Sequence, residues 1–314
     1  MPTNKQKMKD KLLKNNTLII FLLLFIGSSL LSDSFLTSNN LQNLLRQIAP
    51  IGLVSIGMFL VILSGGIDLS VGSILAFIGV LFALLSYELY FGAAFLLALI
   101  FGIGIGSISG YLVSYQRIAP FIATLALMTI VRGAGFLLSK GAPVSVGEHS
   151  ASIMYLGNGV LLGIPISAWI LLLVFGLVFV LLKYHLIGRY IIAIGSNEEA
   201  VRLSGISVEK IKCLVYVISG FLTALAALLV VGRTGVGTPN IGIGLELDAI
   251  AAVVIGGASL SGGKGSVFHT LLGVFILGMI GNIMNLLDVT AYLQQLIKGV
   301  IIILAVIFQK RQIN

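Results

Sequence analysis

Between two long apolar segments lies the sequence IGRYIIAIGSNEEAVRLSGISVEKIK, residues 187–212. Ser196 and Glu199 have the spacing of a capping box, in which the serine hydroxyl accepts from a free backbone N–H and the glutamate reaches back. Gly205 suits the left-handed residue that follows a helix end, and Ser207 is placed to cap the next helix. These residues predict a two-turn helix, too short to be stable alone in water, held outside the membrane where a partner docks.

The composition of the chain is that of a membrane protein. Of its 314 residues 58% are hydrophobic and only 10% are charged, which excludes an ordinary soluble domain. The net charge of +8 does not indicate nucleic-acid binding, because the basic residues are not gathered in one patch. The single cysteine, Cys213, excludes an internal disulfide and a cysteine-rich metal site.

Long apolar runs predict an all-α, polytopic membrane protein. A helix needs about 20 mostly apolar residues to cross a bilayer. By this criterion we expect ten transmembrane helices, at residues 17–35, 48–65, 70–87, 92–114, 119–138, 167–184, 212–232, 247–261, 266–286 and 290–308. The eighth is short, which is typical of a broken or partly re-entrant helix. The predicted domains are a basic tail 1–16, a transmembrane domain 17–308 and a second tail 309–314.

The distribution of lysine and arginine predicts cytoplasmic N- and C-termini. The tail carries five lysines, and the apolar run after it is long enough to remain as a span rather than a cleaved signal peptide. With a cytoplasmic N-terminus, nine further basic residues also fall inside: Arg117, Lys183, Arg189, Arg202, Lys210, Lys212, Lys264, Lys310 and Arg311. Only Arg46, Lys140 and Arg233 fall outside, as the positive-inside rule requires. Residues 187–212 are then cytoplasmic, and the outer loop 139–166 is either a landing area for an external partner or a plain connector.

Two glycine-rich stretches form a weak internal repeat. GGIDLSVG at 65–72 and GGASLSGG at 256–263 are identical at five of eight positions, and each lies between apolar runs. Paired glycine-interrupted segments in the two halves of a membrane protein indicate a translocation path. Chance matching in a chain with 38 glycines is the alternative.

The chain carries no pattern that indicates catalysis. Its three histidines are scattered, without metal-ligand spacing. GGKGS at 262–266 resembles a phosphate-binding loop only superficially, because it lacks the spacing and the preceding strand. The sequence therefore predicts no catalytic residue, no metal and no bound cofactor, and we expect that this chain does not bind ATP.

Charged residues within or beside the spans are candidates for a translocation path. Asp68 costs several kcal/mol at membrane depth unless it is paired or hydrated; it either caps a helix beginning near Leu69 or contacts a solute. Arg132 needs a carboxylate, carbonyls or water, and lines a polar path or snorkels outward. Glu246 and Asp248 open the eighth span, where we expect pairing with Arg233 or Arg132.

Four neutral amides add to these candidates: Asn282, Asn285, Gln294 and Gln295. Amides of this kind suit an uncharged, hydroxylated solute. The alternative is that they join helices, which is their commoner role inside membranes.

Six stretches spread over the chain share one family pattern. They are SGGIDLSVGS at 64–73, PFIATL at 120–125 with RG at 132–133, NEEA at 197–200 with RLSGI at 202–206, ELDAIAA at 246–252, GGASL at 256–260, and QQ at 294–295 with KG at 298–299. In this order they resemble the ribose-type permeases of bacterial ABC sugar importers. Permeases for xylose, galactose, allose, rhamnose and autoinducer-2 share these motifs. Val201 departs from the family loop, which has a second alanine there.

The resemblance implies a permease of the bacterial inner membrane that pairs as a homodimer on two cytoplasmic ATPase subunits, which hold ATP and Mg. An external binding protein would deliver the sugar, ribose or a similar monosaccharide. Residues 197–204 would be the coupling helix pushed by the ATPase, with Glu198, Glu199 and Arg202 giving polar contacts and Ala200 and Leu203 the packing face. Gly205 would tie this helix to the seventh span.

A secondary transporter is the main alternative. It needs intramembrane carboxylates for a coupling ion, and only Asp68 and Asp288 come close. A membrane-embedded enzyme is a third reading, but it needs a clustered polar site at one interface, which the sequence does not show.

Overall fold

The computed structural model describes residues 16–147 and 151–313. The predicted basic tail therefore lies outside the described residues except for Asn16, and residues 309–313 continue the last helix. The described helices are α2 (Asn16–Leu31), α3 (Ser38–Leu63), α4 (Val71–Glu88), α5 (Phe91–Ser114), α6 (Pro120–Ser139), α7 (Ala151–Asn158), α8 (Ile166–Tyr184), α9 (Leu186–Ser196), α10 (Glu198–Leu203), α11 (Val208–Thr234), α12 (Leu245–Ile255), α13 (Val267–Leu286) and α14 (Ala291–Ile313). The strands are β1 (Val144–Ser145), β2 (Val160–Leu161), β3 (Ile164–Pro165) and β4 (Val236–Gly237).

The helical architecture confirms the predicted all-α class. Within the described part of the chain, seven helices are long and apolar enough to cross a membrane: α3, α4, α5, α6, α8, α11 and α13. The other three predicted spans fall on α2, which has 16 residues, on α12, which has 11, and on α14. The count of ten spans and the cytoplasmic location of both termini stay predictions.

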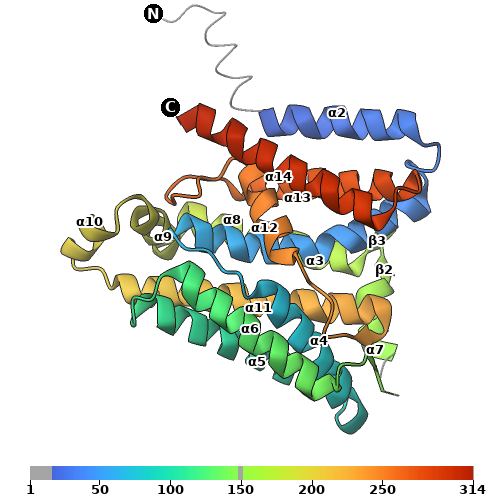
Figure 1. Cartoon of the computed structure of the whole chain (residues 1–314), viewed down its shortest axis with the longest axis horizontal. Coiled ribbons are helices and arrows are strands. Elements are labelled where there is room, and N and C mark those ends of the chain that lie inside the picture. Colours follow the sequence, from blue (N-terminus) through green and yellow to red (C-terminus); the bar gives the residue numbers. More distant parts are fainter. Residues whose placement is uncertain (1–15, 148–150, 314) are drawn as a thin grey trace, which may run out of the picture.

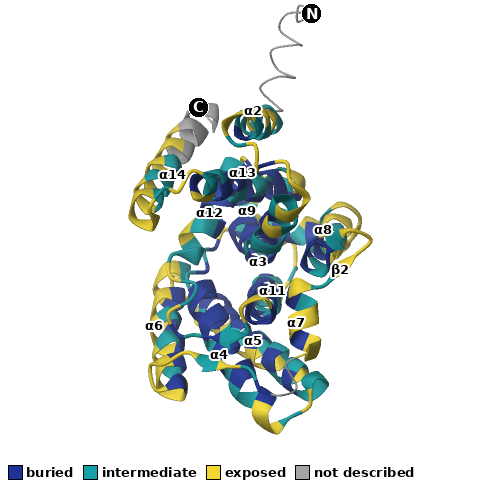
Figure 2. Cartoon of the chain, turned by 90° about the vertical axis from the view of Figure 1, so that its right-hand side faces the viewer, coloured by how far each residue is buried: buried dark blue, intermediate teal, exposed yellow. Residues whose placement is uncertain are grey.

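The bundle is organised around α3 and α11. Both are buried over most of their length, whereas α6, α8 and α14 expose long apolar faces (Figure 2). Small residues allow α5 to approach α11 closely. A Cβ added at Gly106 of α5, for example, would lie 2.5 Å from the carbonyl oxygen of Tyr216 on α11. The core is thus a pair of central helices with a peripheral layer.

The two ends of the bundle differ in character. α9 and α10 project at one end, and α7 with the short strands β2 and β3 lies at the other (Figure 1). The described parts of the predicted loop 139–166 form short elements: β1 pairs with β4, β2 pairs with β3, and α7 packs on the end of α11. There Gly157 faces Gly232 so closely that a Cβ would lie 2.2 Å from the backbone, and the Asn158 side chain donates to the Gly232 carbonyl at 2.9 Å.

The repeated glycine stretches break the helical run at two places that touch each other. Residues 64–70 separate α3 from α4, and residues 256–266 separate α12 from α13. The Gly263 N–H donates to the Leu63 carbonyl at 3.0 Å. Gly195, near the end of α9, packs against the same carbonyl, because a Cβ added at Gly195 would lie only 1.9 Å from the Leu63 oxygen. We call this contact of three backbones the glycine junction.

Candidate functional site

The short helix α10 begins with a different cap from the predicted one. The side chain of Asn197 accepts from the Ala200 N–H at 3.0 Å, whereas the Ser196 hydroxyl donates to the Ile192 carbonyl at 2.9 Å. The predicted capping box is therefore wrong, because an asparagine one residue later is an equally good N-cap.

The end of α10 follows the prediction more closely. Gly205 has φ +79°, which confirms the left-handed turn after the helix. Ser207 stands at the N-cap position of α11 but makes no side-chain capping bond, so the prediction that it caps this helix is wrong. The carboxylate of Glu209, in the first turn of α11, complements that helix end instead.

A chain of charged side chains ties α10 to α11. Arg202 donates to Glu198 Oε1 at 2.9 Å and, through its other terminal nitrogen, to Glu209. Lys212 donates to Glu198 Oε2 at 2.8 Å. Partial burial opposes ionisation of Glu198, but the hydrogen bonds and charges of Lys212 and Arg202 outweigh it and hold the pKa of Glu198 below its usual value. We call these four side chains the charged bracket.

The opposite face of α10 is open to solvent. Leu203 is 81% exposed, and Glu199 and Ala200 are also exposed. Val201 points inward and packs with Ile194 and Val208. Among the predicted coupling residues of α10, Glu199, Ala200 and Leu203 are exposed. Glu198 and Arg202 instead belong to the charged bracket.

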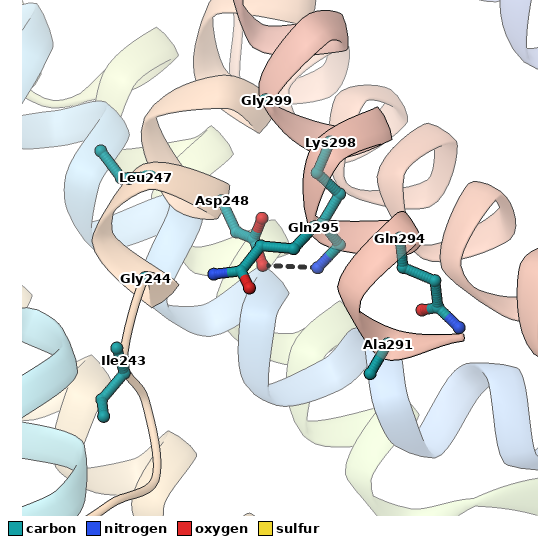
Figure 3. A pocket seen from close by; sticks show the side chains of 9 residues that line it. All are labelled: Ile243, Gly244, Leu247, Asp248, Ala291, Gln294, Gln295, Lys298 and Gly299. Atoms are coloured by element: carbon teal, nitrogen blue, oxygen red, sulfur yellow. Dashed lines mark hydrogen bonds and ion pairs between the residues drawn. The ribbon is translucent and has the colours of Figure 1, made fainter. Parts of the chain in front are cut away.

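A second candidate site is a cavity of about 310 Å³ between the start of α12 and the first half of α14. Asp248 Oδ2 accepts from Lys298 Nζ at 3.0 Å, and the side chain of Gln295 lies beside this pair (Figure 3). The prediction that Asp248 pairs with Arg233 or Arg132 is wrong, because its ion-pair partner is Lys298 of α14. Lys298 falls within the predicted span 290–308, and the sequence indicates no partner for it.

The remaining charged candidates lie elsewhere in the bundle. Arg132 donates to the carbonyls of Pro239 and Ile241 at 2.8 and 2.6 Å, which is one of the predicted solutions for this side chain. Glu246 forms no ion pair within 4 Å in the described part of the chain, but its charge acts on Arg132, so the predicted partner is right although the two side chains are not in contact. One of its carboxylate oxygens is buried without a hydrogen bond and lies against Gly72.

Asp68 is completely buried in the first break. Its Oδ1 accepts from the Ser70 N–H at 3.1 Å and the Ser70 hydroxyl at 2.5 Å, and its Oδ2 accepts from the Ser219 hydroxyl of α11 at 3.0 Å. The carboxylate therefore takes a free backbone N–H, as predicted, but the helix begins at Val71 rather than near Leu69. Asp68 joins the break to the central helix.

Three of the four amides connect helix ends. Asn282 and Asn40 exchange two hydrogen bonds, at 2.8 and 3.0 Å. Gln294 donates to Asn285 at 2.8 Å. Gln294 and Gln295 both line the cavity, and the side chain of Gln295 lies beside the Asp248–Lys298 pair (Figure 3). The structure thus brings Asp248, Gln294 and Gln295 together and leaves the other predicted path residues dispersed.

Comparison with known proteins gives a consistent result. Residues 40–306 match the family described as branched-chain amino acid transport system / permease component. The chain is 43% identical to the ribose import permease protein of Escherichia coli (strain K12) over 97% of its own length and 96% of the relative. It is 42% identical to the ribose import permease protein of Haemophilus influenzae, covering 94% and 93% of the two chains. It is 37% identical to the L-arabinose transport system permease protein of Escherichia coli (strain K12), covering 93% and 89%. No solved structure matches the chain.

Proposed function

The chain belongs to the family of branched-chain amino acid transport system / permease components, and from this premise we propose that its solute is ribose or a closely similar simple sugar. It is the permease subunit of an ATP-binding-cassette sugar importer, a multi-pass protein of the bacterial inner membrane. ATP is hydrolysed by a separate ATPase subunit, and an external binding protein is the other partner. The observation that carries the choice of ribose is the 43% identity to a ribose import permease over 97% of the chain.

The helix α10 is the coupling helix in this proposal. It has only six residues, yet it is capped at both ends and presents exposed side chains at one end of the bundle. The exposed residues Glu199, Ala200 and Leu203 form the face that enters a cleft of the ATPase, and ATP held there with Mg drives its movement. Alternating access of the membrane bundle follows that movement.

The orientation of the protein follows from the same role. α10, the basic tail 1–16 and the tail 309–314 are cytoplasmic, and ten spans cross the membrane within residues 17–308. α7 and the two-stranded hairpin β2–β3 then lie outside, within the loop 139–166, where the binding protein docks. The charge asymmetry of the loops supports this arrangement.

A second copy of the chain completes the permease. Gln295 is exposed on α14 next to Leu296, which is 68% exposed. A polar side chain that faces lipid at membrane depth is unfavourable, and a partner copy packed on the same side covers it. The cavity beside the Asp248–Lys298 pair then opens toward the interface, where its amide and charged groups can hydrogen-bond to sugar hydroxyls. Gln294 lines the same cavity, whereas the remaining path residues of this proposal lie elsewhere in the bundle: Asp68, Arg132, Glu246, Asn282 and Asn285.

Reconstitution tests the proposal directly. Liposomes that carry the permease and its ATPase, with the binding protein added, should take up labelled ribose only when ATP is supplied on the side of the membrane where the ATPase lies. Uptake that persists without the ATPase would support a secondary transporter and overturn the importer's coupling. Excess unlabelled arabinose that competes as well as ribose would overturn the choice of sugar while leaving the transporter class intact.

A further inference from the structure

The stability of α10 in its observed position needs an explanation. A helix of six residues has almost no intrinsic stability. Its only buried side chain is Val201, which joins a cluster of three buried residues, the others being Ile194 and Val208. α10 also contacts α9, and the charged bracket joins it to the first two turns of α11. The link between the two helices is otherwise the turn 204–207, in which Gly205 is left-handed.

The geometry of the bracket resists hinging about this turn. Each oxygen of Glu198 is held by a different helix, Oε1 by Arg202 on α10 and Oε2 by Lys212 on α11. Arg202 in turn reaches Glu209, which precedes Lys212 by three residues on the same face of α11. Two ionic contacts one helical turn apart fix an angle as well as a distance. An isolated exposed ion pair contributes little, but the Lys212 side chain is only 13% exposed and the four charges are linked in one chain of ion pairs.

The helix held by the bracket is the one best connected to the rest of the bundle. α11 packs on α3, α4 and α5 along its length, and α7 packs on its far end. Through Ser219 it also holds Asp68 in the first break. A displacement of α11 therefore reaches both the break and the opposite end of the bundle.

We propose that the charged bracket makes α10 and α11 move as one body, so that Arg202, Glu198, Glu209 and Lys212 are positioning residues for coupling ATP hydrolysis to sugar transport. This inference rests on the proposed role of α10 as the coupling helix. Two functions are then divided between the two faces of α10. The outward residues bind the ATPase, and the bracket transmits its displacement.

A charge reversal tests the inference in the assembled importer. Arg202→Glu places its carboxylate beside those of Glu198 and Glu209, and Glu209→Arg places two guanidinium groups together. Each single variant should bind the ATPase and hydrolyse ATP, but the sugar transported per ATP should fall about tenfold, within the range of coupling between distant sites. The double variant R202E/E209R restores opposite charges between positions 202 and 209 but leaves the carboxylate at position 202 beside Glu198, so it should recover part of the ratio. Lys210→Gln is the matched control, because Lys210 lies in the same turn of α11, is exposed, and forms no ion pair within the described residues.

The outcomes separate this inference from the proposed function. Single variants with normal sugar-to-ATP ratios, or a double variant as poorly coupled as the singles, overturn the bracket's role. If a reversal variant does not fold, the milder Glu209→Gln should still lower the ratio, and an unchanged ratio there also overturns it. Leu203→Asp should abolish ATPase binding. If it does not, α10 is not the docking helix, and the proposed function of α10 fails whatever the bracket variants do.

Discussion

The two breaks in the helical bundle, residues 64–70 and residues 256–266, end their first helix in the same way. Gly65 has φ +82° and Gly257 has φ +78°. In each case the residue after the glycine donates its N–H to the carbonyl five positions earlier, at 2.9 and 3.2 Å. This is the hydrogen bond of a Schellman motif, which satisfies a carbonyl that the helix end leaves free.

The turns that follow also correspond. The Ser70 N–H donates to the side chain of Asp68 at 3.1 Å, and the Ser261 N–H donates to the side chain of Ser259 at 3.3 Å. These two turns keep the alignment of the sequence repeat, whereas the left-handed glycines, Gly65 and Gly257, are one residue out of it. Only the first break, however, uses a carboxylate and continues its bonds to α11.

The difference between the breaks lies in what holds them. The first is short and fixed by side chains buried in the core, whereas the second is longer and carries an exposed lysine, Lys264. The second is held by backbone bonds, including the one from Gly263 to Leu63 that closes the glycine junction. Two breaks with matching local turns are therefore held differently. Side-chain hydrogen bonds to α11 anchor the first break, whereas the second is bonded through its backbone to the end of α3.

Removing the carboxylate from the first break should have the largest effect. Asp68→Ala leaves the Ser70 amide and two buried hydroxyls without an acceptor, so we expect a loss of about 3 kcal/mol in the free energy of unfolding. Ser259→Ala should cost about 1 kcal/mol or less, because it removes one neutral bond. Denaturant unfolding of both variants in detergent measures the difference. Equal losses would show that the two breaks are held alike.

Filling the glycine junction should come next. Gly195→Ala places a Cβ 1.9 Å from the Leu63 oxygen and 2.5 Å from the Gly263 nitrogen, so backbone must shift. Overpacking of this kind costs about 2 kcal/mol. The control is Gly176→Ala on α8, where nothing lies within 4 Å of the added carbon. Thermal unfolding midpoints should separate the two, and a Gly195→Ala variant as stable as the control would mean that the junction opens freely.

The shared helix ends predict two equal and smaller effects. Gly65→Ala and Gly257→Ala meet no close contact, so only the positive φ opposes the added carbon. Each should lower the free energy of unfolding by about 1 kcal/mol. The same unfolding assay compares them. A difference well above that value between the two would break the structural equivalence of the breaks.

The smallest effect is expected at the tip of the second break. Lys264 is exposed and forms no ion pair within the described residues. Lys264→Gln should change stability by less than about 0.5 kcal/mol. A larger loss, measured in the same assay, would show that the second break is also anchored by a side chain.

Much of the local structure could be predicted from the sequence. The apolar runs locate the seven long helices, and Gly205 marks the end of α10, because these features depend on neighbouring residues. The capping assignment failed by one residue because Ser196 and Asn197 are both good caps. A local pattern cannot choose between adjacent candidates of equal strength.

The tertiary contacts could not be predicted from the sequence. The glycine junction joins segments near residues 63, 195 and 263, and no spacing rule connects them. The pairing of Asp248 with Lys298 likewise depends on how α14 lies against α12. The spacing of Glu209 and Lys212 indicates two opposite charges on one helix face. Their partners on α10, Arg202 and Glu198, follow only from the fold of the turn between the two helices.

The length of α11 has a consequence for the importer in the cell. Its 27 residues rise about 40 Å, whereas the hydrocarbon core of a bilayer is about 30 Å thick. In the proposed orientation the end of α11 that carries Glu209 and Lys212 lies beyond the hydrocarbon, where dissolved ions screen interactions between exposed charges that are more than about 8 Å apart at physiological ionic strength. The bracket's contacts of 2.9 and 2.8 Å are far shorter than that distance, and Lys212 is largely buried. If the bracket transmits motion, a cell whose cytoplasmic salt rises under osmotic stress should therefore keep the same amount of sugar imported for each ATP.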